Sequence, residues 1–316
     1  SSQRLASGRK GVTAAESHRG ALKLLQTDPS SRQLFSHPRL QLYPLQPRAL
    51  LAQKKARYDL ITLPRLGSFG GGTGLFALQE EYQLTSEAFQ AMWQQLQPTG
   101  MLRVSSWIDF PLRRPLKLLA TLTQLLEQEN ISAPSRYLIA IRDWGSITFL
   151  LKKTPFNQQE LAAVRSFCHQ LQFDPLLLPD LAPSERAIFH QPASESFFLP
   201  FEQIMATNAQ KLFKISSFEL RPATDDRPFF SRFLRWSSLP ELYRLWQNGS
   251  LQLIELGDLI LLISLLQLTL AAVLLIILPL YRLGFHSRNK VKTFCYFSGL
   301  GMGYMFFEMV LIHQLG

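Results

Sequence analysis

The sequence contains little cysteine and little charge. Among its 316 residues there are only two cysteines, Cys168 and Cys295, and 18% of the residues are charged. Two distant cysteines favour free buried thiols and supply neither a disulfide framework nor the ligands of a zinc site. No HExxH pair and no Ser-His-Asp order is found around the six histidines, so we expect no metal and no hydrolase chemistry. The composition also excludes collagen, a coiled coil and a disordered tail.

The positive charge is large but scattered. The formal net charge is +10, and the sequence pI is about 9.8. No basic helix face alternates with stacking aromatic residues, so nucleic acid binding is not expected. A membrane protein whose apolar segments have cationic flanks gives the same total charge.

Two long apolar runs lie near the end of the chain. The run LILLISLLQLTLAAVLLIILPL covers residues 259–280, and FCYFSGLGMGYMFFEMVLI covers residues 294–312. We predict transmembrane helices at about 257–281 and 293–314 and therefore an integral protein of a bacterial-type inner membrane. Expected partners are the lipid bilayer and neighbouring transmembrane helices of the parent chain or of a second copy. Glu308, inside the second run, fits either a functional or an assembly role.

The remaining sequence alternates strand and helix patterns, which predicts an α/β sheet. Short apolar runs at 11–15, 40–43, 58–63 and 101–107 are typical of strands, with a stop expected at Pro64. Helices are predicted at 20–26, from the N-cap Thr85 onward, and at 115–129. The segments 137–141 and 146–152 predict an antiparallel hairpin.

These segments resemble a known family when they are taken in order. The resemblance is carried by VTAAESHRGALKLL at 12–25, HPRLQLYPLQPRALL at 37–51, YDLITLP at 58–64, GSFGGGTGLFALQEEYQLTSEAF at 67–89, LQPTGMLRVSSW at 96–107 and TDDRPFF at 224–230. The series resembles the integral-membrane branch of the spermidine-synthase-like proteins, which have the S-adenosylmethionine-dependent methyltransferase fold.

The resemblance implies three regions. Residues 1–155 are expected to form a Rossmann-like methyltransferase domain that is truncated at its N-terminus. Residues 156–245 are expected to form a mixed extension with the DDRPFF motif, and residues 246–316 the two transmembrane helices. The glycine-rich turn after the first strand of the fold has no counterpart here, since Ser1 to Lys10 match at most the end of the following helix. We therefore expect this chain to be a piece of a longer one.

The resemblance also implies a cofactor, S-adenosylmethionine or its decarboxylated form, in the intact parent. Glu16, after the first predicted strand, would accept hydrogen bonds from the ribose hydroxyls, unless it is only a solvated strand-end carboxylate. Gln46 stands where the family usually has an acid that receives the adenine amino group, so it is expected to be a weaker contact. Without the glycine-rich turn, we expect this chain alone to bind the cofactor weakly or not at all.

The expected acceptor side departs from the polyamine-forming members of the family. Those members place aspartates after the fourth strand, whereas this sequence has the basic segment Pro64 to Gly67 there, which favours methyl over aminopropyl transfer. Glu80, Glu81 and Tyr82 can line the pocket mouth as catalytic groups or form an exposed loop. The run 70–74 lacks the Lys of a phosphate-binding loop and fits either a mobile lid or a plain loop.

The DDRPFF motif supplies two further candidate catalytic acids, Asp225 and Asp226. With Arg227 they form either a structural ion cluster or a site that attracts a cation. The predicted function is a membrane-anchored transferase with its soluble domain in the cytoplasm, where S-adenosylmethionine occurs. The alternative is a membrane transport or scaffold protein in which the transferase fold has lost catalysis.

Overall fold

The computed structural model describes residues 11–29, 35, 37–53, 56–67, 79–192, 195–247, 257–278 and 290–315. The chain forms two compact units, Ser1–Asp258 and Leu259–Gly316. The glycine run at 70–74, the segment 1–10 and most of the basic loop at 282–292 lie outside the described residues, so the expectations for them stay untested.

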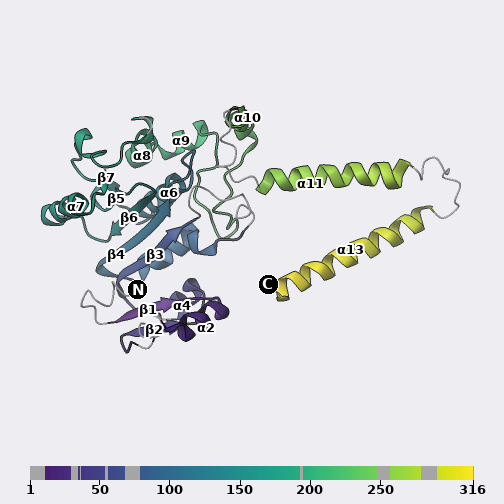
Figure 1. The fold of residues 1–316 in the computed structure, drawn as a ribbon, viewed down its shortest axis with the longest axis horizontal. Helices are drawn as coiled ribbons and strands as arrows, with labels where there is room; N and C mark the ends of the chain where they lie inside the picture. Colours follow the sequence, from purple (N-terminus) through teal and green to yellow (C-terminus); the bar gives the residue numbers. More distant parts are fainter. Residues whose placement is uncertain are drawn as a thin grey trace. The chain divides into compact units, whose positions relative to one another are not determined.

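A small parallel sheet opens the larger unit (Figure 1). Strand β1 (Val12–Ala15) pairs in parallel with β2 (Leu40–Tyr43). Helix α2 (Arg19–Thr27) follows β1, and α4 (Pro47–Gln53) follows β2. The α2 helix begins where the Nδ1 atom of His18 accepts a hydrogen bond from the Ala21 backbone amide at 3.1 Å.

The main sheet has five strands in the order β3-β4-β6-β5-β7. Strands β3 and β4 are parallel, whereas the β4–β6, β6–β5 and β5–β7 pairs are antiparallel. The strands are β3 (Tyr58–Leu66), β4 (Leu96–Trp107), β5 (Leu138–Arg142), β6 (Ser146–Lys152) and β7 (Asp174–Leu177). The two sheets and their helices confirm the predicted α/β class, and the β5–β6 pair of the main sheet confirms the predicted hairpin.

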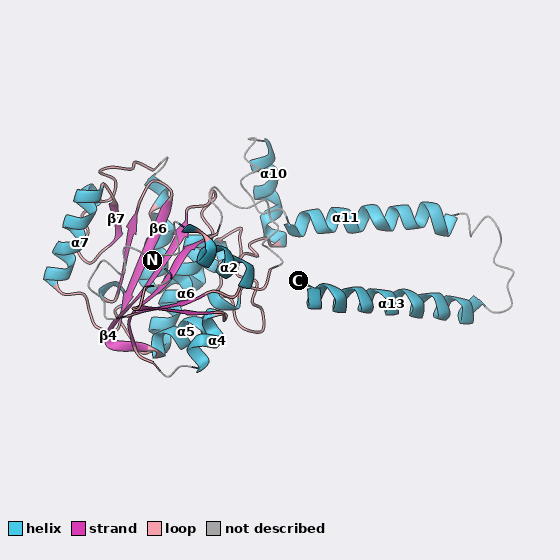
Figure 2. Cartoon of the chain, turned by 60° about the horizontal axis from the view of Figure 1, so that its bottom comes forward, coloured by secondary structure: helices cyan, strands magenta, loops and turns pink. Residues whose placement is uncertain are grey.

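Helices cover both faces of the main sheet, on either side of the strands in Figure 2. On one face α6 (Arg114–Gln128) and α5 (Ser86–Gln94) bury a large core that includes Val104 and Phe149. On the other face α7 (Gln158–Leu171) packs a smaller cluster around Ile139. Because successive strand residues point to opposite faces, Ile139 and Ala140 belong to different clusters.

Short elements complete the described chain. The α-helices are α8 (Leu199–Gln203), α9 (Ala209–Ile215) and α10 (Leu239–Gln247), with π-helical turns at Ile204–Asn208 and Val273–Ile277. The 3-10 turns are Tyr82–Leu84, Pro134–Arg136, Pro183–Glu185, Glu195–Phe197 and Trp236–Ser238.

The structure corrects the predicted strand ends. Strand β3 continues through Pro64 to Leu66, because the β3–β4 pairing is irregular between Leu63 and Leu66 and tolerates a residue without an amide hydrogen. Strand β4 begins at Leu96 rather than at Met101, since Tyr58 already pairs with Leu96.

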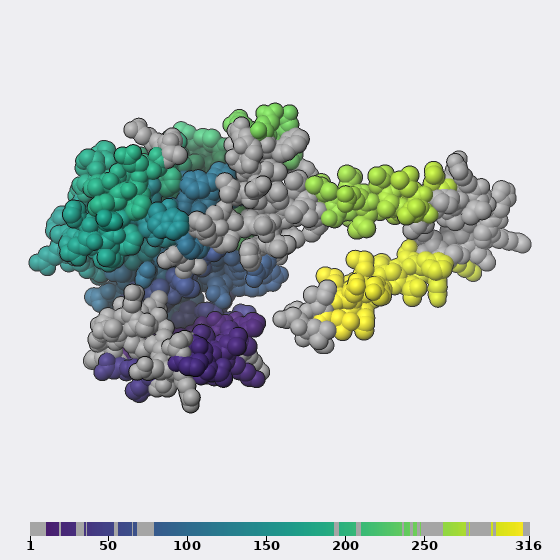
Figure 3. Space-filling model, viewed as in Figure 1, coloured from purple at the N-terminus to yellow at the C-terminus, as the bar shows by residue number. Residues whose placement is uncertain are grey.

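The smaller unit contains α11 (Gly257–Ala272) and α13 (Lys290–Leu315), whose apolar side chains are widely exposed (Figure 3). None of the helices in the described part of the chain is both long and apolar enough to cross a membrane. Regular α-helix in α11 covers 16 residues, about 24 Å, against a hydrocarbon core of about 30 Å. Helix α13 is longer, with 26 residues, but it mixes glycines, Lys290, Lys292 and Glu308 with its apolar residues. The prediction of an integral membrane protein with spans at 257–281 and 293–314 is therefore wrong.

Candidate functional site

Glu16 and Gln46 lie at the same edge of the small sheet. Glu16 follows β1 directly, and its backbone amide donates to the Tyr43 carbonyl at the end of β2 (3.0 Å). Gln46 is exposed three residues beyond β2 and precedes α4, whose Leu50 amide donates to the Gln46 carbonyl at 3.0 Å. Because β1 and β2 are parallel, both residues stand at the carboxyl edge, where open α/β sheets bind ligands.

The Glu16 carboxylate is half-buried and only partly engaged. Its Oε1 atom accepts a hydrogen bond from the His18 backbone amide at 2.9 Å. This contact fixes the side chain beside the start of α2, and acceptor sites remain on both carboxylate oxygens. The arrangement suits a group that must accept two hydroxyl donors.

Glu81 holds the DDRPFF segment in place. Its backbone amide donates to the Pro228 carbonyl at 2.7 Å, and its Oε2 atom accepts from the Ser231 backbone amide at 2.9 Å and from the Ser231 hydroxyl. The Oε1 atom lies 3.6 Å from Nη1 of Arg114. These contacts give the Glu81 carboxylate a structural role that accounts for its position.

Tyr82 and Glu80 form an exposed pair in the same loop. The negative charge of Glu80 raises the pKa of the Tyr82 phenol, and partial burial and a hydrogen bond with Glu80 act in the same direction. Tyr82 therefore stays protonated at neutral pH. As a phenol it can donate a hydrogen bond to a ligand, but it is a poor proton acceptor.

Asp225 forms an ion pair with Arg48, a residue of α4. The Nη1 atom of Arg48 donates to Oδ1 at 2.6 Å, Nη2 contacts Oδ2, and the Thr85 hydroxyl donates to Oδ1 at 2.8 Å. The hydrogen bond from Arg48 holds the pKa of the Asp225 carboxyl below its usual range. Asp226, by contrast, is exposed. Asp225 thus supports the structural interpretation of the motif.

Arg114 is the first residue of α6, and its side chain lies beside Gly67, which directly follows β3. Its Nη2 atom donates to the Ser231 hydroxyl at 2.7 Å, and its guanidinium lies 5.8 Å from the ring centre of Phe230. Gly67, directly after β3, has a φ of +83°, and a Cβ there would lie 2.7 Å from Nε of Arg114. Only glycine therefore fits both the backbone conformation and the close approach of the arginine.

The structure thus separates the predicted site residues into two groups. Glu81 and Asp225 secure the segment 223–231 against α5 and α6, and sequence reasoning missed their partners Arg48, Arg114 and Ser231. Glu16 and Gln46 stay open at the β1–β2 edge. Arg48 joins the two groups, since it lies two residues after Gln46 and contacts Asp225. Among the described residues, no group of three or more His, Cys, Asp or Glu is arranged to hold a metal ion.

The chain is similar in structure to several solved proteins. A probable spermidine synthase from Corynebacterium glutamicum matches 58% of this chain and 64% of its own, at 18% identity and a TM-score of 0.35. Human methyltransferase-like protein 13 in complex with SAH matches 51% of this chain and 70% of its own, at 13% identity and a TM-score of 0.33. Spermidine synthase from Thermotoga maritima matches 63% of this chain and 61% of its own, at 12% identity and a TM-score of 0.36.

These likenesses are weak, and they carry no argument about activity. The chain spans less than two thirds of the length of the two spermidine synthases. No protein-family model matches the sequence, and no curated protein matches it.

Proposed function

We propose that this chain belongs to an S-adenosylmethionine-type transferase and that the carboxyl edge of β1 and β2 holds the nucleoside part of the cofactor. The observation that carries the proposal is that Glu16 and Gln46 both stand at that edge, Glu16 after β1 and Gln46 after the parallel strand β2. The two parallel strands β3 and β4 followed by an antiparallel hairpin support it, because this is the strand order expected of the methyltransferase fold.

The cofactor would bind through hydrogen bonds that the two side chains can make. The Glu16 carboxylate would accept from both ribose hydroxyls, and the Gln46 carbonyl oxygen would accept from the adenine amino group. Methyl transfer is favoured over aminopropyl transfer. It requires chiefly that acceptor and sulfonium be positioned, whereas amine alkylation needs a free acid near the acceptor, and two of the candidate acids, Glu81 and Asp225, are already engaged.

The engagement of those two acids also favours a second candidate, a scaffold that keeps the fold without catalysis. Such a protein would bind its partners through the same α/β domain and would bind no nucleoside at the β1–β2 edge. The two candidates therefore differ in one measurable property, nucleoside binding.

The test is a titration of the full chain with 5′-methylthioadenosine and with S-adenosylmethionine. Binding is measured by saturation-transfer NMR, which detects weak binding. Glu16→Ala should weaken binding by at least about tenfold, since it removes two charge-assisted hydrogen bonds. Glu127→Ala is the matched control, because Glu127 is an exposed carboxylate on α6. Binding that is detectable but equal in wild type and Glu16→Ala would favour the scaffold.

A further inference from the structure

A cavity of about 430 Å³ lies on the α7 face of the main sheet. Its floor includes Arg103 and Ser105 of β4 and Thr148 and Leu150 of β6, and α7 contributes Val164 and Phe167. The register pairs Arg103 with Leu150 and Ser105 with Thr148, so these four side chains share one face. None of them belongs to the β1–β2 edge.

Arg103 lines this cavity and has no charged partner among the described residues. Its side chain is exposed, and no described residue forms an ion pair or a side-chain hydrogen bond with its guanidinium. Beside it, the hydroxyls of Ser105 and Thr148 satisfy one another at 2.8 Å. A cation at the mouth of a cavity, next to satisfied hydroxyls, is placed to receive an anionic group.

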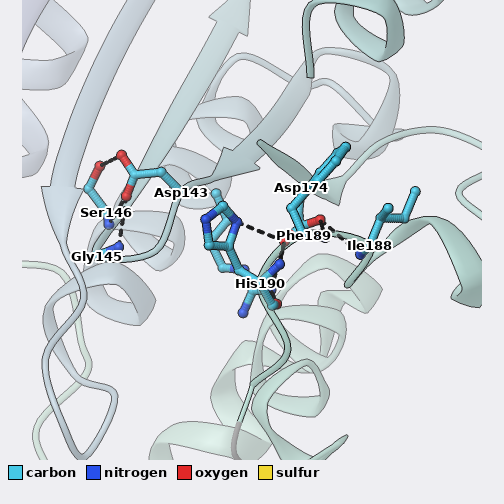
Figure 4. Close-up of polar contacts among 8 residues, drawn as sticks. Asp143, Gly145, Ser146, Asp174, Ile188, Phe189 and His190 are labelled. Carbon is cyan, nitrogen blue, oxygen red and sulfur yellow. Dashed lines mark hydrogen bonds and ion pairs between the residues drawn. The ribbon is translucent and has the colours of Figure 1, made fainter. Parts of the chain in front are cut away.

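The Asp143 carboxylate also lines the cavity, and its oxygens are engaged by hydrogen bonds within the turn. Asp143 accepts hydrogen bonds from the Gly145 amide at 2.8 Å, from the Ser146 hydroxyl at 2.7 Å and from the Ser146 amide (Figure 4). These donors close the turn between β5 and β6. Asp143 therefore stabilises this turn.

Arg142 also borders the cavity, but its side chain serves the opposite face. It follows Ile141 in β5, and successive strand residues point to opposite faces. Its guanidinium lies 3.2 Å from the buried carboxylate of Asp174 and 5.1 Å from the Phe197 ring centre, on the α6 side. The positive charge of Arg142 is thus neutralised by Asp174.

The remaining walls of the cavity are apolar. Leu150, Val164, Phe167 and Phe173 all line it, and the rings of Phe167 and Phe173 lie 5.7 Å apart. Cavities of about 300–1,000 Å³ with apolar walls and a few polar groups are typical small-molecule sites. An apolar body of several carbons would fit between the two rings and the sheet.

We propose that this cavity binds a small amphipathic carboxylate, with the anionic group on Arg103 and the apolar body against Phe167 and Phe173. The site is separate from the proposed nucleoside site. It requires neither the β1–β2 edge nor the cofactor.

The proposal is tested by calorimetric titration of the full chain with octanoate and with octanol, which share the apolar body and differ in charge. Wild type should bind octanoate at least about tenfold more tightly than octanol, because only octanoate gains the charge-assisted hydrogen bond. Arg103→Gln should remove this preference while octanol binding is kept. Arg136→Gln, which removes an exposed arginine outside the cavity, should keep the preference.

A second pair of variants locates the site. Val164→Trp fills the cavity and should abolish saturable binding of both probes, whereas Gln170→Trp, at an exposed position of the same helix outside the cavity, should leave binding unchanged. Equal binding of the two probes by wild type, an unchanged preference in Arg103→Gln, or undiminished binding in Val164→Trp would each overturn the proposal. So would the absence of saturable octanoate binding in the millimolar range.

Discussion

The small sheet and the main sheet differ sharply in burial. All four residues of β1 are half-buried, whereas four of the five residues of β5 are buried. The β1–β2 part buries Leu22 and Leu50, while the main sheet encloses a core that runs from Leu63 to Phe230. The candidate nucleoside residues thus stand on the less buried part. The largest core lies in the main sheet, whereas the candidate nucleoside residues stand on the small sheet, so each can be perturbed without the other.

The largest expected effect is on the main core. Phe149→Ala removes a fully buried ring from β6 and should lower the free energy of unfolding by about 3–5 kcal/mol. Val12→Ala in half-buried β1 should cost less than about 1 kcal/mol, since little buried surface is lost. Urea unfolding of the two variants measures both changes. Equal costs would remove the distinction between the two sheets.

The next effect concerns the buried ion pair at the far end of the main sheet. Asp174 is fully buried and accepts hydrogen bonds from the amides of Ile188, Phe189 and His190 at 2.7–2.9 Å (Figure 4). It also accepts a hydrogen bond from Arg142 at 3.2 Å. Burial lowers the pKa of the Arg142 guanidinium, although Asp174 offsets this. Asp174→Asn should destabilise the chain by about 3 kcal/mol, because it leaves a buried cation without its counter-charge.

A double variant separates this charge effect from a loss of packing. When Arg142→Met is added to Asp174→Asn, the unpaired cation is gone, so the double variant should lose clearly less stability than the sum of the single losses. Chemical unfolding of the four proteins measures the coupling. Strictly additive losses would mean that the ion pair itself matters little.

Local features of the fold could be predicted from the sequence, and long-range pairings could not. The Thr85 cap of α5, the β5–β6 hairpin and the strand at 40–43 depend on neighbouring residues, and the structure confirms them. Apolar residues alone gave a wrong prediction of a membrane span at α11, because an apolar stretch of sequence does not show where the regular α-helix ends.

The candidate site follows the same rule. Glu16 could be placed because it directly follows a strand signal, and Gln46 because the resemblance places it in the loop after the next strand. The partner of Asp225 could not be predicted, since Arg48 lies 177 positions away and gives no local signal. The DDRPFF motif marked the segment as important, but only its contacts show that Asp225 secures the structure.

The smallest expected effect concerns the ion pair that joins the two regions. Arg48 of α4 binds Asp225, and this pair ties the helix after β2 to the start of α5. Because both side chains are about one third exposed, Arg48→Met should cost only about 1 kcal/mol at pH 7. Hydrogen exchange should nevertheless become faster in β1 and β2 than in β5 and β6, since only the small sheet loses a tether.

The pH dependence of this loss has a definite sign. The pKa of Asp225 is lowered in the folded state, so the pair contributes stability above the unfolded pKa of about 3.9, and this contribution disappears as the pH falls through the lower folded value. Wild type and Arg48→Met should therefore differ in stability at pH 6–7, and the difference should shrink as the pH falls below about 4. Thr27→Ala, which removes a hydroxyl from the exposed end of α2 without touching the pair, should show no such convergence. A difference between wild type and Arg48→Met that stays constant down to pH 3 would mean that the arginine acts through packing and that the two regions are not joined by charge.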